Sequence, residues 1–480
     1  MSEPEVMFAN IEYEPRSNKI HLWEIVDGKK THLEIPYQHN YYISDDNGTC
    51  FDMYGNRMTK ATAKRRKDAE SSINILPSNT IIAESDISEP IKYLHERYNF
   101  TNLKPNPDYI NTMTFDIEVE ASDEFPKATE VKYAINAISA YFSRSNKLVV
   151  MTYSAEGKKY QNKITVDEIY EQTKGYRDKN GERVYEGVKL DSYDLYEFTN
   201  ELQMLESFCT IVKKESIDII TGWYIEQFDI PYLINRMAAL GSMAWQKLSP
   251  IKKVERDNYG HYIIKGVSVL DYLKVYKDRF TFDNKGSYSL NNICNIEIRK
   301  SKLEYEGTIS DLWKTDWDTF ITYNIIDTLR VVELDRKLKF ITLIVIMTHE
   351  SLIPYVGILG TLQDHLGLLL RFLAKQGKVL NNREENEVKK FPGAFVYANQ
   401  GLYRYVISFD VTSLYPTIII RDNIGQETLI HNPETEHYVE VSKNGFRLLI
   451  MATVMMTVIR EHQEIRIPAG EIMETDIIRI

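Results

Sequence analysis

The sequence predicts a multidomain protein in which an α+β amino-terminal region precedes an α/β region with a mixed sheet. The chain has 480 residues, and domains of about 150 residues are typical, so about three are expected. Short β-like runs separated by turn residues fill the first 105 residues, whereas strands alternate with helices between about 110 and 335. An ordinary composition, 43% hydrophobic and 26% charged, excludes disordered and collagen-like chains.

The amino-terminal region is recognised by β-like runs at 39–45, 49–55 and 79–85. The Pro-containing segment NLKPNPDY closes it, so we expect an amino-terminal domain over residues 1–105. Within it lies the basic segment RMTKATAKRRK, at residues 57–67. Such a segment is more often a solvated helix face, and its alternative is a contact to nucleic-acid phosphates.

The α/β region is defined by a change to alternating strands and helices. The expected elements are strands at 113–120, 134–142 and 147–154, a helix over 195–214, a buried strand over 217–223, a helix over 228–241, a hairpin over 254–266, helices from about 330 to 377, and an apolar strand running into a turn over 401–420.

Cysteine content and hydropathy bear on location. Cys50, Cys209 and Cys294 lie far apart without a CxxC pair, which excludes a disulfide framework and a thiolate zinc site and favours a reducing cytoplasm. No apolar run reaches the ~18 residues that cross a bilayer, so we expect no membrane contact. The net charge of −11 does not exclude a nucleic-acid enzyme, because carboxylates that hold divalent cations lower it.

Acidic side chains alternate along the strand FDIEVE. Asp116, Glu118 and Glu120 share one face. Taken alone, such a row is more often the solvated face of an edge strand. The alternative is a site for one or two Mg²⁺ or Mn²⁺ ions, which requires ligands from elsewhere in the chain.

Further candidate ligands lie at strand and helix positions later in the region. Asp229 follows the strand at 217–223, and Asp327 shares a helix face with Tyr323, four residues earlier. Singly, Asp229 is more often a helix N-cap, and a Tyr/Asp pair is common. The alternative is a metal site in which the phenol of Tyr323 orients a water molecule beside a metal-bound carboxylate.

In this order, DxE on a strand, YIEQFD near a strand end and YxxxD on a helix resemble the three exonuclease motifs of family B DNA polymerases. SFDVTSLYPTII at 408–419 is similar to the first palm motif of that family, DxxSLYPS. KKFPGAFV, at 389–396, resembles the segment that links exonuclease and palm. The order and spacing look most like the polymerases of T-even-type bacteriophages, over residues 1 to about 430.

The resemblance implies a ribonuclease H-like 3′–5′ exonuclease domain over 106–340 and the start of a palm over 341–480. It implies two Mg²⁺ or Mn²⁺ ions per active site, with exonuclease ligands at Asp116, Glu118, Asp229 and Asp327. Tyr323 and Glu118 would position the attacking water, and Lys302 would face the phosphate. One departure is Tyr224, where the family usually has Asn.

The same resemblance assigns roles in the palm. Asp410 would hold the polymerase Mg²⁺ ions, and the main-chain N–H groups of Leu414 and Tyr415 would face the triphosphate of a dNTP. The Tyr415 ring would lie under the deoxyribose. Primer-template DNA and single-stranded DNA are the implied partners, with a sliding clamp for the complete enzyme, in the host cell cytoplasm.

The sequence carries neither the fingers helix nor the DTD-type second palm motif of a complete family member. From about Phe446 its character changes, and the apolar run at 448–459 is a core helix, a strand without a partner or the product of a reading-frame change. We expect a truncated or split polymerase that extends primers only with the missing part, on a second polypeptide if it exists. The alternative is a catalytically silent nucleic-acid-binding or assembly fragment, and the intact exonuclease carboxylates favour the enzyme.

Overall fold

The computed structural model describes residues 4–120, 126–281, 285–303, 307–383, 401–402, 404, 413–424, 429–431, 439–441, 447–448, 456–460 and 463–467. The chain divides into two compact units. The first comprises Met1–Tyr41, Ala61–Ser78 and Ser85–Gln376, and the second comprises Tyr42–Lys60, Asn79–Glu84 and Gly377–Ile480. The domain limits inferred from sequence stay predictions.

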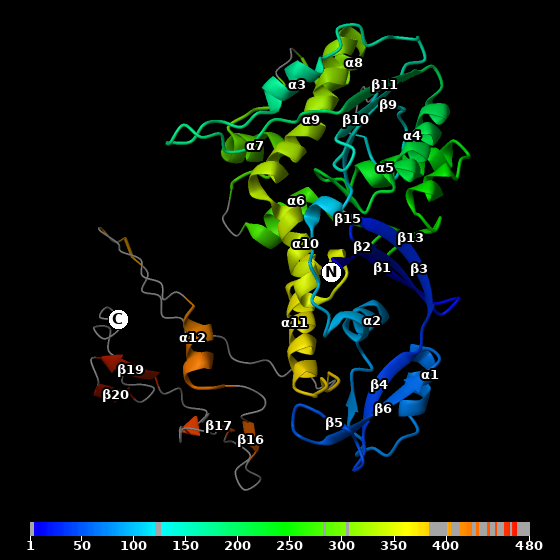
Figure 1. The fold of residues 1–480 in the computed structure, drawn as a ribbon. Coiled ribbons are helices and arrows are strands. Elements are labelled where there is room, and N and C mark those ends of the chain that lie inside the picture. The colour runs from blue at the N-terminus through cyan, green and yellow to red at the C-terminus, as the bar shows by residue number, and fades with distance from the viewer. Residues whose placement is uncertain are drawn as a thin grey trace. The chain divides into compact units, whose positions relative to one another are not determined.

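A six-stranded mixed sheet forms the centre of the first unit (Figure 1). Its strands, in spatial order, are β11 (Ser192–Phe198), β10 (Lys147–Tyr153), β9 (Ile135–Phe142), β8 (Thr112–Val119), β12 (Ile219–Gly222) and β15 (Ser268–Asp271). Strand β9 is antiparallel to both neighbours, and the other pairs are parallel. The predicted mixed sheet is therefore confirmed, but β8 is an interior strand, so interpreting its acidic face as a sheet edge is wrong.

Helices cover both faces of this sheet, as Figure 1 shows. Helices α4 (Glu201–Glu215) and α5 (Asp229–Ala239) bury Phe208 and Leu233 against the β8 side chains of Phe115 and Ile117. Helix α9 (Trp317–Leu338) packs Phe320 against the opposite face. Burial of apolar area on both faces, at about 25 cal/mol per Å², is the main stabilising contribution to such a layered domain.

The helix expected over 195–214 is wrong in its first part. Residues 195–198 belong to β11, which pairs in parallel with β10 over its whole length. Helix α4 begins only after Asn200, whose side chain accepts a hydrogen bond from the Gln203 N–H and so caps the first turn. Strand pairing with a distant segment outweighs the local helical pattern here.

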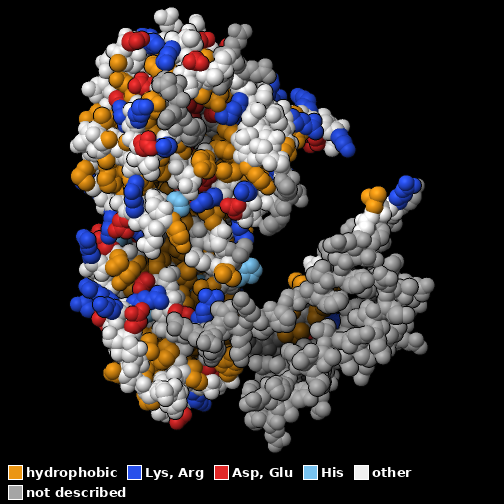
Figure 2. Space-filling view, turned by 180° about the vertical axis from the view of Figure 1, so that it is seen from behind, with side chains coloured by type: hydrophobic (Ala, Val, Ile, Leu, Met, Phe, Trp, Pro, Cys, Tyr) orange, Lys and Arg blue, Asp and Glu red, His pale blue; other side chains and the backbone are white. Residues whose placement is uncertain are grey.

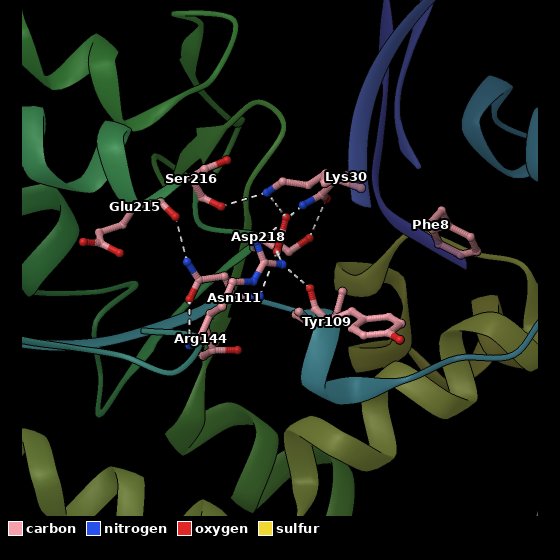
Figure 3. A network of polar contacts seen from close by, with 12 residues as sticks. Phe8, Lys30, Tyr109, Asn111, Arg144, Glu215, Ser216 and Asp218 are labelled. Carbon is pink, nitrogen blue, oxygen red and sulfur yellow. Dashed lines mark hydrogen bonds and ion pairs between the residues drawn. The ribbon is translucent and has the colours of Figure 1, made fainter. Parts of the chain in front are cut away.

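An antiparallel amino-terminal sheet of β1 (Val6–Glu14), β2 (Lys19–Val26) and β3 (Lys29–Pro36) also belongs to the first unit, and sequence analysis missed it. Asp218, just before β12, connects it to the central sheet (Figure 3). Its carboxylate accepts hydrogen bonds from Lys30 Nζ at 2.6 Å and from the Asn111 N–H at 2.8 Å, and Arg144 lies 3.8 Å away. A buried, multiply paired carboxylate fixes one sheet against the other.

The remaining described elements include the expected hairpin of β13 (Val254–Arg256) and β14 (Tyr262–Ile264). The other helices are α1 (Arg66–Ile73), α2 (Glu89–Tyr98), α3 (Val166–Thr173), α6 (Tyr272–Lys274), α7 (Leu290–Ile298), α8 (Ile309–Thr315), α10 (Phe340–Ser351) and α11 (Thr361–Lys375). No helix in the described ranges is long and apolar enough to cross a membrane.

A four-stranded sheet of β5 (Cys50–Phe51), β6 (Arg57–Ala63), β4 (His39–Ser44) and β7 (Ile82–Ala83) contributes to the second unit. Strands β4, β5 and β7 agree with the predicted β-like runs, whereas β6 occupies residues 57–63 of the basic segment, so a helix is wrong there and begins only at Arg66. Helix α12 (Leu414–Arg421) replaces the turn expected near residue 415, while the strand expected before it, at 405–412, lies outside the described residues. Strand β19 (Met456–Arg460), which includes the end of the apolar run, pairs with β20 (Gln463–Ile467) after the run. The described end of the run is therefore neither a helix nor an unpaired strand. A three-stranded antiparallel sheet consists of β16 (Leu429–His431), β17 (Val439–Val441) and β18 (Arg447–Leu448).

Candidate active site

An acidic cluster lies at the carboxyl-terminal edge of β8, next to the end of the parallel strand β12. Asp116 and Glu118 point to the α9 face of β8, as the predicted alternation requires. The Asn324 side chain of α9 donates a hydrogen bond to Asp116 Oδ2 at 2.7 Å. The carboxyl ends of parallel strands are the usual place for a site in open α/β sheets.

Glu120 does not join this cluster. The register of β8 against β9 shifts between Glu118 and Val119, because Asn136 of β9 has no partner in β8. Burial raises the pKa of Glu120, and its charged neighbours are Glu201 and Arg236 rather than Asp116. Glu120 thus lies among other charged groups than Asp116 and Glu118 do, and its expected place on the same strand face stays a prediction.

Asp229 reaches the same sheet edge from the first turn of α5. Its side chain is 3% exposed, and Oδ1 accepts a hydrogen bond from the Ile117 N–H at 3.0 Å. Strand β12 pairs with β8 only as far as Thr114, so this carboxylate takes the place of a strand partner. The residue before α5 is Phe228, so Asp229 is not the N-cap of its helix.

The turn between β12 and α5 depends on a close backbone approach and on a residue that sequence analysis missed. A Cβ on Gly222 would lie 2.6 Å from the Phe115 carbonyl oxygen, so only glycine fits beside β8. Asp271, at the end of β15, accepts hydrogen bonds from the N–H groups of Tyr224 and Glu226, both at 3.1 Å. Tyr224 has a φ of 67°, a left-handed conformation that this carboxylate holds.

Helix α9 brings Tyr323 and Asp327 to the cluster, and Lys302 reaches them from the segment that follows α7. Lys302 Nζ donates hydrogen bonds to the Tyr323 hydroxyl, at 2.7 Å, and to Asp327 Oδ2. Asp327 is 4% exposed, and its Oδ1 has no hydrogen-bond partner among the described residues. Lys302 is therefore an internal counter-ion rather than a surface lysine. Sequence analysis also missed Asn324, the residue after Tyr323, because nothing in the sequence shows which group the side chain of a helical Asn will contact.

Burial raises the pKa of all four carboxyls, and repulsion within the cluster adds to this for Asp116 and Glu118. Burial, followed by repulsion from Asp327, raises the pKa of Glu118 to about 8. Burial raises the pKa of Asp229 to about 7 against the opposing hydrogen bond from Ile117. The pKa of Asp116 rises well above its ordinary value through burial and then through Asp229 and Glu118. Burial also raises the pKa of Asp327, although Lys302 opposes this.

This arrangement can hold hard divalent cations. The donor atoms are carboxylate oxygens, which suit Mg²⁺ and Mn²⁺. The unpartnered Asp327 Oδ1 and the raised carboxyl pKa values both show that positive charge would be favourable here. The donor atoms of the cluster are of the kind that the implied ions prefer, and the binding of those ions stays a prediction.

The predicted palm residues belong to the second unit. Leu414 and Tyr415 open helix α12, and Tyr415 is 70% exposed. Asp410 lies outside the described residues. The roles of these three residues stay predictions.

Charge on the protein surface is mixed. Figure 2 shows Lys and Arg side chains interspersed with Asp and Glu on the face that it presents. Among the basic residues of the segment at 57–67, Arg66 pairs with Glu70 at 3.3 Å on exposed helix α1. The interpretation as a solvated face and that as a phosphate contact both stay open for experiment.

Two family models match the chain. A model described as the exonuclease domain of DNA polymerase family B matches residues 69–293, and one described as DNA polymerase family B matches residues 360–467. The second match continues past Phe446, where the composition changes.

Curated proteins give the same picture. The DNA-directed DNA polymerase of Escherichia phage RB69 is 33% identical over 84% of this chain and 45% of its own length. That of Enterobacteria phage T4 is 31% identical over 79% of this chain and 42% of its own length. The DNA polymerase catalytic subunit of Saimiriine herpesvirus 2 is 24% identical over 57% of this chain and 29% of its own. The chain thus spans less than half the length of the phage polymerases.

Proposed function

Because this chain belongs to DNA polymerase family B, we propose that its first unit is a metal-dependent 3′–5′ exonuclease that shortens DNA from the 3′ end. The resemblance recognised in the sequence motifs is confirmed, and the mixed sheet agrees with the expected ribonuclease H-like fold. The observation that carries the activity is the convergence of four carboxylates, from β8, α5 and α9, on one sheet edge. Proofreading during replication is the proposed role.

The residues of the cluster divide the work. Asp116, Glu118, Asp229 and Asp327 would hold two Mg²⁺ or Mn²⁺ ions, which supply a hydroxide nucleophile at neutral pH and stabilise the leaving 3′ oxygen. Tyr323, with its hydroxyl held by Lys302, and Glu118 would orient the attacking water. Burial raises the pKa of Tyr323, so its hydroxyl keeps its proton and can act as a donor.

Lys302 supplies a fixed positive charge at the cluster. It pairs with Asp327, and that pairing raises the pKa of the ammonium group against the effect of burial. The ammonium therefore stays charged at the pH of catalysis. We propose that it helps to neutralise the charge that develops on the scissile phosphate.

The test is digestion of single-stranded DNA that carries a 5′ label, with Mg²⁺ and with EDTA. Asp116→Ala should reduce digestion by at least about two orders of magnitude, and Tyr323→Phe should slow cleavage while Mg²⁺ binding is kept. Asp194→Asn, in β11 of the same sheet and paired with Lys147 at 2.8 Å, is the matched control and should digest normally. Digestion by Asp116→Ala at the parent rate would refute the assignment, and binding without digestion by the parent would favour the silent fragment.

Polymerisation is a further proposal, since it concerns the whole length of the relatives. Asp410 would hold the Mg²⁺ ions of a second site, and the backbone of Leu414 and Tyr415 would bind the dNTP. Primer extension is expected only when the fingers and the second palm motif are supplied, on a second polypeptide or in one longer chain. A sliding clamp is the proposed partner of that complete enzyme.

A further inference from the structure

Two histidines and a glutamate gather on the amino-terminal sheet, away from the carboxylate cluster. His21 Nδ1 lies 3.0 Å from His32 Nε2. A carboxylate oxygen of Glu34 completes a set whose ligand atoms all lie within 4.8 Å of one another. The register explains this, because His21 pairs with Glu34 and Trp23 with His32 across β2 and β3, which places all four side chains on one face.

Trp23 and Glu14 lie next to the two imidazoles. The His32 ring stacks on Trp23 with 4.5 Å between ring centroids and 9° between planes. The His21 ring is buried, and its second nitrogen, Nε2, has no hydrogen-bond partner among the described residues, although Glu14 Oε2 lies 3.7 Å away. Glu14 is itself held by Lys253 at 3.5 Å. A carboxylate behind the far nitrogen of a histidine is the arrangement that orients metal-bound histidines.

We propose that His21 Nδ1, His32 Nε2 and a Glu34 oxygen bind a divalent cation of the zinc class, with water as the remaining ligand. Imidazole nitrogens combined with one carboxylate suit Zn²⁺. Two nitrogens that each bind one Zn²⁺ ion at about 2.0 Å are only slightly farther from each other than His21 Nδ1 is from His32 Nε2. The carboxylate cluster of the proposed exonuclease offers mainly oxygen donors and suits Mg²⁺. The two sites therefore select different metals.

Binding requires two small rearrangements. The hydrogen bond between the rings is broken, and each neutral ring keeps its one proton on the other nitrogen, so that His21 Nε2–H faces Glu14 and His32 carries its proton on Nδ1. Lys19, which pairs with Glu34 at 2.8 Å, must release it. That pair is exposed on both sides, and such pairs contribute little to stability. The bound ion then joins β2 to β3.

The probe for this site is Co²⁺, which reports its coordination by visible absorption, with Zn²⁺ as competitor. The protein should carry no histidine tag, and excess Mg²⁺ should be present to occupy the carboxylate cluster. We expect one equivalent of Co²⁺ with a four-coordinate spectrum that Zn²⁺ abolishes. His32→Gln and Glu34→Gln should each weaken binding by about 10-fold or more. Glu14→Gln, a positioning variant, should weaken it by about 10-fold without changing the ligand set.

His261→Gln is the matched control, because His261 has a carboxylate neighbour, Asp257 at 3.2 Å, without a second imidazole beside it. It should bind Co²⁺ like the parent. Since His32 and Glu34 are exposed, their variants should fold, and equal unfolding midpoints without metal would verify this. Undiminished Co²⁺ binding by His32→Gln and Glu34→Gln would overturn the proposal. Mg²⁺-dependent digestion should be the same in His32→Gln and the parent, which separates failure here from failure of the exonuclease assignment.

Discussion

Replacing Glu118 by Gln is expected to stabilise the metal-free protein at alkaline pH, although it should damage the proposed nuclease. In the folded protein the pKa of Glu118 rises from 4.5 to about 8, through burial and repulsion by Asp327. Below pH 4.5 the carboxyl of Glu118 is protonated in both the folded and the unfolded protein, and the free energy of unfolding has its full value. As the pH rises through about 8, this stability is lost, because the carboxyl ionises more readily in the unfolded chain than in the folded protein. Gln cannot ionise, so the variant keeps its stability.

The magnitude follows from the pKa change. One pKa unit corresponds to about 1.4 kcal/mol, so the full change is on the order of 5 kcal/mol. Glu118 is half-buried, and screening by solvent reduces this, so we expect about 2 kcal/mol at pH 8.5, or several °C in the unfolding midpoint. Mg²⁺ should raise the midpoint of the parent more than that of Glu118→Gln, because the cation offsets the charge that the variant lacks.

The assay is thermal unfolding in EDTA and in Mg²⁺ from pH 5 to pH 9. Glu130→Gln is the control, since Glu130 is an exposed glutamate paired with Lys127 at 2.8 Å, and its substitution should leave the pH profile unchanged. A Glu118→Gln midpoint equal to or below that of the parent in EDTA at pH 8.5 would refute the reasoning.

Two further predictions concern the surface and the docking of the amino-terminal sheet. Four basic residues lie just before α1 and at its start: Lys64, Arg65, Arg66 and Lys67. Neutralising them should weaken binding of single-stranded DNA and should reduce the slope of log affinity against log salt concentration by about 0.7 for each DNA phosphate that is no longer neutralised. An unchanged slope would identify a solvated face. Asp218→Asn should lower the free energy of unfolding by about 3 kcal/mol, since Lys30 then loses its buried counter-ion. Unchanged denaturant midpoints for Asp218→Asn would contradict this docking role.

Part of the carboxylate cluster could be predicted because its residues follow local rules. Period-two alternation placed Asp116 and Glu118 on one face, and helical spacing placed Tyr323 beside Asp327. Asn324 could not be predicted in the same way, because its hydrogen bond to Asp116 joins residues 208 positions apart. Such contacts depend on how α9 packs on the sheet, which no local pattern contains.

The fold was predictable to the same extent. The strands of the central sheet from 112 to 153 alternate or carry branched apolar residues, and the structure confirms them. Strand β2 was missed because it is buried on both faces and shows no alternation, while β3 is mostly exposed and polar. Pairing between them, rather than the composition of either, makes the amino-terminal sheet.

The carboxylates of the site need supporting contacts, of which sequence analysis named Lys302, for a role at the phosphate, and missed Asn324. Four carboxyls with raised pKa values oppose folding near neutral pH, so the fold must hold them by contacts with other groups. Lys302 supplies a cation to Asp327, Asn324 supplies a donor to Asp116, and the Ile117 N–H supplies one to Asp229. Each contact lowers the free energy of one ionised carboxylate while leaving other oxygens available. The motif residues thus define what the site can bind, and their partners determine whether the chain can fold around it before a cation arrives.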